Sequence, residues 1–143
     1  MKKQILGAIT ALSVLLTLTP ACSHLGIGAA KNPVDELIGF CKSDNYKEAA
    51  KHMLYDGADA SKKNKAGNYE QDDARAKERV ERSCKQFKAI SELGYKVTNE
   101  EVKTQGDKTG YLYDVEIKDG AKTEKQKWIF MKMDGTNVLV DID

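Results

Sequence analysis

Histidine is scarce in this chain, and its two copies, His24 and His52, lie far apart in the sequence. A protein metal site usually takes several His or Cys ligands at short spacings such as His-x-x-x-His. Neither histidine has a partner at such a spacing, and the chain has only three cysteines. The sequence therefore predicts no metal site, and no motif in it indicates another cofactor.

An excess of charge of one sign is also missing. The chain of 143 residues has 23 Lys and Arg against 22 Asp and Glu. Nonspecific binding to nucleic acid needs a basic surface that neutralises several phosphates, so we expect no nucleic-acid partner. Charged residues make up 31% of the chain and aromatic residues 7%, which is typical of a well-hydrated globular domain.

The N-terminus has the parts of an export signal. Met1-Lys2-Lys3 is positively charged, and residues 5–18 form an apolar run interrupted only by small or hydroxyl residues. A transmembrane helix needs about 20 apolar residues, which is more than this run offers. We therefore expect residues 1–21 to be a signal peptide that is removed, which leaves a chain of one-domain size.

The residues at the end of this signal, Leu18-Thr19-Pro20-Ala21-Cys22, resemble the lipobox of bacterial lipoproteins. Thr19 stands where that family usually has leucine, whereas Ala21 fits the pattern. The resemblance implies a diacylglycerol with fatty acids such as palmitate on Cys22, a tether over residues 22–31, and a membrane partner through the lipid. The protein would then face the periplasm or lie at the outer membrane of a Gram-negative cell. Ordinary cleavage, which would leave a soluble periplasmic or secreted protein, is the alternative.

Helical periodicity covers the first half of the expected domain. Apolar residues recur at helical spacing over 33–42, 46–54 and 70–93. Asn32 is a suitable cap for the start of the first helix, and Gly94 is suited to end the third. The intervening stretch 57–69 has no apolar pattern and predicts a mobile loop.

Alternating apolar and polar residues follow these helices. The pattern predicts strands over 95–104, 111–117, 126–133 and 138–142, and Asp119-Gly120 and Asp134-Gly135 predict turns between the last three of them. Helices followed by antiparallel strands favour an α+β domain, because the sheet must bury one face against the helices.

Two segments carry a resemblance to a known superfamily. Asn45–Ala50 and Lys127–Gly135, together with the order of helices and strands, resemble the nuclear transport factor 2-like (NTF2-like) superfamily of cystatin-like cones, and more narrowly its small exported lipoproteins of unknown function. The resemblance covers roughly residues 32–143. It implies N-terminal helices packed on a curved antiparallel sheet of about four strands, often with a pocket at the mouth of the cone. A fold of this kind does not assign a function.

Cys41 and Cys84 lie on the apolar faces of helices that we expect to be neighbours in an oxidising compartment. A disulfide between them is the natural pairing. Two buried free thiols are the alternative, and a catalytic thiol is disfavoured because neither cysteine has a base beside it in the sequence.

Pocket residues are implied only by the superfamily resemblance. Tyr111, Tyr113 and Trp128 would line the pocket, and Asp114 or Asp141 would supply a carboxylate. Aromatic residues that alternate along a strand are more often core residues, however. We therefore expect a noncatalytic envelope protein that binds a small apolar ligand or a partner protein. The alternative is a pocket-type isomerase, dehydratase or hydrolase.

The lipid and the disulfide can be checked together by mass spectrometry of the protein from its native host. We expect a mature N-terminus at Cys22 that carries acyl groups, and a peptide pair linked through Cys41 and Cys84. Protein that retains residues 1–21 and carries no lipid would contradict the export hypothesis.

Overall fold

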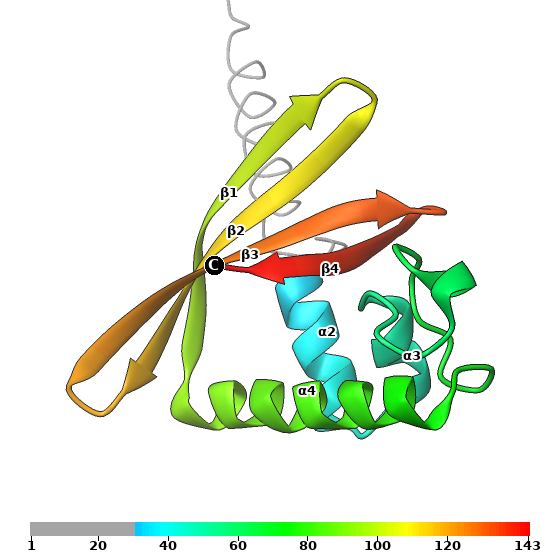
Figure 1. Ribbon diagram of the computed structural model, residues 1–143. Coiled ribbons are helices and arrows are strands. Elements are labelled where there is room, and N and C mark those ends of the chain that lie inside the picture. The colour runs from blue at the N-terminus through cyan, green and yellow to red at the C-terminus, as the bar shows by residue number, and fades with distance from the viewer. Residues whose placement is uncertain (1–30) are drawn as a thin grey trace, which may run out of the picture. The chain divides into compact units, whose positions relative to one another are not determined.

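The computed structural model describes residues 31–143 (Figure 1). The expected signal peptide, Cys22 and the tether up to residue 30 lie outside the described residues. The helices are α2 (Pro33–Lys42), α3 (Tyr46–Lys51), the 3₁₀ helix η1 (Ala60–Lys62) and α4 (Ala74–Leu93). The strands are β1 (Tyr95–Gln105), β2 (Lys108–Asp119), β3 (Lys122–Met133) and β4 (Thr136–Ile142). Residues 32–143 form one compact unit. Within 31–143, no helix combines the length and the apolar character needed to cross a bilayer.

Polar caps set where the helices begin. The side chain of Asn32 accepts the N–H of Asp35 at the start of α2, and Asp73 accepts the N–H of Ala76 at the start of α4. The helix expected to begin at residue 70 therefore begins at Ala74. The helix expected to reach residue 54 ends at Lys51, because Met53 leaves it to form a bridge with β4.

The stretch 57–69 is a loop, but hydrogen bonds hold both of its ends. The N–H of Tyr55 donates to the carbonyl of Lys65 at 2.9 Å, and the N–H of Gly67 donates to the carbonyl of Met53 at 2.9 Å. The loop also contains η1. It is therefore more structured than the mobile loop that its composition predicts.

The sheet has the order β1-β2-β3-β4, and every pair in it is antiparallel. The turn between β3 and β4 is Asp134-Gly135, where both residues have positive φ, as a type I′ hairpin turn requires. All four predicted strands exist, and each is longer than its pattern indicates. The α+β class, with helices first and a twisted four-stranded antiparallel sheet after them, is confirmed (Figure 1).

One face of the sheet packs on the helices. Trp128 and Phe130 of β3 are fully buried there, and the ring of Trp128 lies 4.9 Å from that of Phe87 on α4. The buried face of α2 completes this core with Val34, Leu37, Ile38 and Cys41. Burying large apolar side chains of this kind supplies most of the free energy that stabilises a domain.

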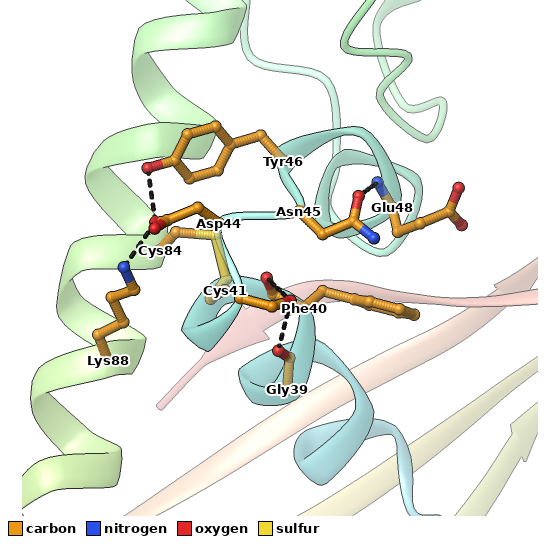
Figure 2. The surroundings of a disulfide bond; sticks show 10 residues. Gly39, Phe40, Cys41, Asp44, Asn45, Tyr46, Glu48, Cys84 and Lys88 are labelled. Atoms are coloured by element: carbon orange, nitrogen blue, oxygen red, sulfur yellow. Dashed lines mark hydrogen bonds and ion pairs between the residues drawn. A yellow bond between two sulfur atoms is a disulfide. The ribbon is translucent and has the colours of Figure 1, made fainter.

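A disulfide joins α2 to α4 through Cys41 and Cys84, both of which are buried (Figure 2). Beside it, Lys88 Nζ lies 2.5 Å from Asp44 Oδ1, and the hydroxyl of Tyr46 donates to the same carboxylate (Figure 2). The hydrogen bond from Lys88 holds the pKa of Asp44 below its ordinary value. The expected pairing of the two cysteines is present in the structure.

Replacing Cys41 and Cys84 together by alanine is expected to lower the free energy of unfolding by about 4 kcal/mol, the chain-entropy value for a loop of this size. The bond spans 43 positions of sequence, so its loss frees a long stretch of the unfolded chain. Urea unfolding of the two proteins measures the difference. Equal unfolding midpoints would contradict a structural role for the disulfide.

Candidate functional site

An open groove of about 560 Å³ lies between α4 and β4, and the segment 53–56 closes one side of it. We call it the α4–β4 groove. Its apolar lining comes from Met53, Val80, Phe87, Leu139, Val140 and Ile142. Polar and charged side chains, among them Asp56, Lys63, Arg79 and Asp141, make up nearly half of the lining. Concave surfaces that combine apolar and polar groups are where small molecules usually bind.

The wall formed by α4 follows from helical spacing. Ala76, Val80, Ser83 and Phe87 lie on successive turns and all line the groove. Ala76, Val80 and Phe87 are buried, whereas Ser83 is half-buried and places a small polar side chain midway along the wall. The small size of Ala76 and Ser83 leaves room for a ligand beside the helix.

The opposite wall depends on how β4 is held. The N–H of Leu139 donates to the carbonyl of His52 at 2.8 Å, which ties β4 to the end of α3. The register between β3 and β4 then shifts, so that Val140 is an extra residue between Leu139 and Asp141. Such a bulge bends a strand and turns its side chains. The groove lies beside this bend.

Charged groups surround the rim. Arg79 Nε lies 2.5 Å from Asp56 Oδ2, and Lys63 and Asp141 also contribute to the lining. The side chains of Arg79 and Asp56 are about half exposed, so this ion pair adds little to stability. It does hold a guanidinium group at the groove.

One end of the groove is closed by a buried carboxylate. Asp72 accepts the N–H of Asn68 at 2.7 Å, and its other oxygen lies 3.1 Å from Lys62 Nζ. Lys62 Nζ also donates to the carbonyl of Gln71 at 2.8 Å. Both oxygens of Asp72 are thus occupied by groups that fix the loop, which makes Asp72 a structural residue.

A second carboxylate network lies next to it. The hydroxyl of Tyr55 donates to Asp73, and the N–H of Asp59 donates to the Tyr55 oxygen at 2.8 Å. The hydrogen bond from Tyr55, with further backbone N–H groups, lowers the pKa of Asp73 to about 2. A side chain on Gly57 would collide with Tyr55 and Asp73, so only glycine fits there.

Two of the carboxylates at the groove already have partners. Asp72 is fully engaged, and Asp56 is paired with Arg79. His52 does not line the groove: its Nδ1 lies 2.9 Å from the carbonyl oxygen of Asn137, and its ring lies against Phe40. Within residues 31–143, no three His, Cys, Asp or Glu side chains lie close enough to bind a metal ion.

The aromatic residues implied by the resemblance lie elsewhere. Trp128 is in the core, and its Nε1 donates to Gln126 Oε1 at 3.0 Å. Tyr113 is also buried, and its hydroxyl donates to Glu100 Oε1 at 3.0 Å. Burial and this carboxylate raise the pKa of Tyr113 to about 12. Tyr111 packs against the same core, and none of the three lines the groove.

The two aspartates implied by the resemblance lie in different parts of the structure. Asp114 lies on the other face of the sheet, 2.9 Å from Lys127 Nζ, and this hydrogen bond lowers the pKa of Asp114. Asp141 lies at the groove, but its Oδ1 accepts the N–H of Ile142 at 2.9 Å. The structure therefore brings Asp141 to the groove and leaves Asp114 away from it.

Sequence reasoning missed most of the groove. Val80 and Phe87 belong to the helical apolar pattern, which predicts core residues. The pattern does not show that a groove remains beside them. Ser83 and Arg79 were a usable signal, because a serine and an arginine flank that apolar face at helical spacing.

No protein-family model matches the chain, and no curated protein matches it either. One solved structure that the chain resembles is an NTF2-like protein with a cystatin-like fold from Novosphingobium aromaticivorans. The two are 14% identical and superpose with a TM-score of 0.37, over 96% of this chain and 89% of the other. That protein carries the superfamily name that the sequence resemblance gives. A likeness at this level adds no argument about ligand or activity.

The lowered pKa of Asp73 predicts a loss of stability in acid. Its folded-state value of about 2 lies below the ordinary value of about 4, so its contribution is present above pH 4 and is lost as pH falls toward 2. Asp73→Asn keeps an N-cap for α4 but removes the titration. The free energy of unfolding should therefore fall less between pH 4 and pH 2 in Asp73→Asn than in the wild type. Asp107→Asn, in the exposed turn between β1 and β2, is the control. Equal losses of unfolding free energy between pH 4 and pH 2 in Asp73→Asn and the wild type would contradict this prediction.

Proposed function

We propose that this protein is a noncatalytic cell-envelope lipoprotein that binds a small amphipathic molecule in the α4–β4 groove. The observation that carries the proposal is an open groove of about 560 Å³ that is lined by both apolar and polar side chains, with the guanidinium group of Arg79 among them. An apolar body would lie against the half-buried Leu139 and Val140 and the exposed Ile142, above the buried Phe87, and a polar or anionic end would meet Arg79.

Binding of an anionic end would replace the contact between Arg79 and Asp56. That contact lies at the surface, where an ion pair contributes roughly 0–1 kcal/mol, so its loss is a small cost to the ligand. The apolar contacts would supply most of the affinity, because each buried CH₂ group contributes about 0.8 kcal/mol.

The place in the envelope is proposed from the leader and from the disulfide. Buried disulfides persist in oxidising compartments and are rare in the cytosol, and Cys41 and Cys84 form such a bond here. The leader and the lipobox-like residues before Cys22 support delivery to the membrane surface. A lipid on Cys22 would keep the groove close to molecules of the envelope.

A pocket-type enzyme of the same superfamily is the second candidate, because Asp141 and Asp56 place carboxylates at the groove. An isomerase, dehydratase or hydrolase would alter its ligand. Recovery of an unchanged ligand after prolonged incubation supports binding, whereas a new product by mass spectrometry supports the enzyme.

Filling the groove tests the proposed function. Ser83→Phe places a large side chain midway along the α4 wall, and we expect it to weaken binding of the probe 1-anilinonaphthalene-8-sulfonate at least about tenfold, or 1.4 kcal/mol. The probe combines an apolar body with an anionic group. Its own fluorescence and that of Trp128, the only tryptophan in the chain, both report binding. Trp128 is suitable because it packs on Phe87 at the floor of the groove.

The matched control is Ala89→Phe, which adds the same ring to the exposed side of α4. Arg79→Gln should weaken binding of the sulfonate, whereas Arg82→Gln, on the same helix but away from the groove, should not. Thermal unfolding of each variant checks that the fold is kept. Equal affinity of Ser83→Phe and Ala89→Phe for the probe would refute the assignment of the groove.

A further inference from the structure

The two edges of the sheet differ in how they are covered. At the β4 edge, the N–H of Leu139 donates to the carbonyl of His52, and the N–H of Ile142 donates to the side chain of Asp141. At the β1 edge, no residue of the described chain pairs with the outer side of the strand. An open edge strand is a template for pairing with another strand.

The hairpin between β1 and β2 decides which groups of β1 point outward. Gln105 is paired with Lys108 across a two-residue turn, and such a pair exchanges hydrogen bonds inside the hairpin. Backbone groups alternate in direction along a strand. The N–H and C=O groups of Glu100, Val102 and Thr104 therefore point away from β2 and are free to pair.

We propose that β1 pairs antiparallel with β1 of a second copy of this chain, about a two-fold axis that passes through Val102. In this register Val102 exchanges hydrogen bonds with its own copy, and Glu100 lies opposite Thr104 of the second copy. All the outward-pointing backbone groups of this part of β1 then have partners. The result is one continuous sheet across two molecules.

Charge selects this register over its neighbours. With the axis at Val102, Glu101 lies opposite Lys103 of the second copy, and the pair occurs twice by symmetry. A shift that moves the axis to Glu101 places two glutamates opposite each other, and a shift to Lys103 places two lysines opposite each other. Like charges directly opposite in an antiparallel pair are destabilising, whereas opposite charges are favourable.

Exposure and shape allow this contact. Val102 is 55% exposed, the most exposed large apolar side chain of the described residues, and pairing would bury it against its copy. The β1–β2 hairpin extends beyond the helices, so that a second hairpin can approach it (Figure 1). A register shift at Val97 and Asn99 interrupts the strand, which limits regular pairing to its outer half.

The contact is therefore small, and the dimer should be weaker than those that bury about 800 Å² per partner. Attachment of both copies to one membrane would favour it by raising their effective concentration. The pairing does not use the α4–β4 groove, so it is independent of the proposed ligand site, and only the membrane contribution rests on the proposed lipid anchor.

Cross-linking tests the position of the axis. We expect Val102→Cys to give a covalent dimer with a thiol-specific cross-linker of about 8 Å, because each introduced thiol lies beside its own copy, about 5.5 Å away between Cα atoms. Glu100→Cys and Thr104→Cys should each fail alone, because residues of the same number would lie about 14 Å apart. A mixture of those two variants should cross-link.

The experiment uses the chain as the cell processes it, purified in mild detergent, and the unmodified protein controls for reaction at other cysteines. Cross-linking of the variants at positions 100, 102 and 104 to the same extent would overturn the proposal. So would a failure of the position 102 variant to cross-link at any concentration at which the protein stays soluble.

Charge exchange tests the register by a second route. Glu101→Lys and Lys103→Glu should each abolish the dimer in sedimentation analysis, and the double variant should regain it, because opposite charges then face each other again. Circular dichroism checks that each variant is folded. Dimerisation that both single variants keep, or that the double variant does not regain, would contradict the predicted register.

Discussion

The attachment of α4 to its two neighbours is the constraint on which the rest of the structure depends. Phe87 packs on Trp128 of β3, and Cys84, one turn earlier in the helix, is bonded to Cys41 of α2. The same helix is thus held against the sheet by an apolar contact and against α2 by a covalent bond. Because Phe87 also lines the α4–β4 groove, this side of the groove is built on the core.

The groove exists because β4 is held at one end and bent at the next residue. The hydrogen bond from Leu139 to the carbonyl of His52 keeps the strand beside α3, and the extra residue Val140 then turns it. On the facing helix, Ser83 is too small to fill the space that results. A larger side chain there would have extended the core outward and closed the surface, as at most positions of an amphipathic helix.

Local signals predicted the elements well, and contacts between distant segments escaped them. Asn32 marks the start of α2 because its cap and its partner are neighbours in sequence, and alternation marks every strand because the period is local. The order of the loop fixed by Asp72 and Asp73 was not predicted. Composition does not show which residues of a loop form hydrogen bonds with one another. The groove was missed for the same reason, since Val80 and Leu139 meet only after the chain has folded.

The α4–β4 groove and the open edge of β1 lie at opposite edges of the sheet. The groove lies beside β4 and the open edge belongs to β1, so β2 and β3 stand between them. Those two strands carry buried aromatic contacts, including Tyr113 edge-on against Phe130 and Trp128 against Phe87. A ligand beside β4 and a second copy on β1 would therefore not compete for space. Any influence of one on the other would have to pass through the close-packed core between β1 and β4.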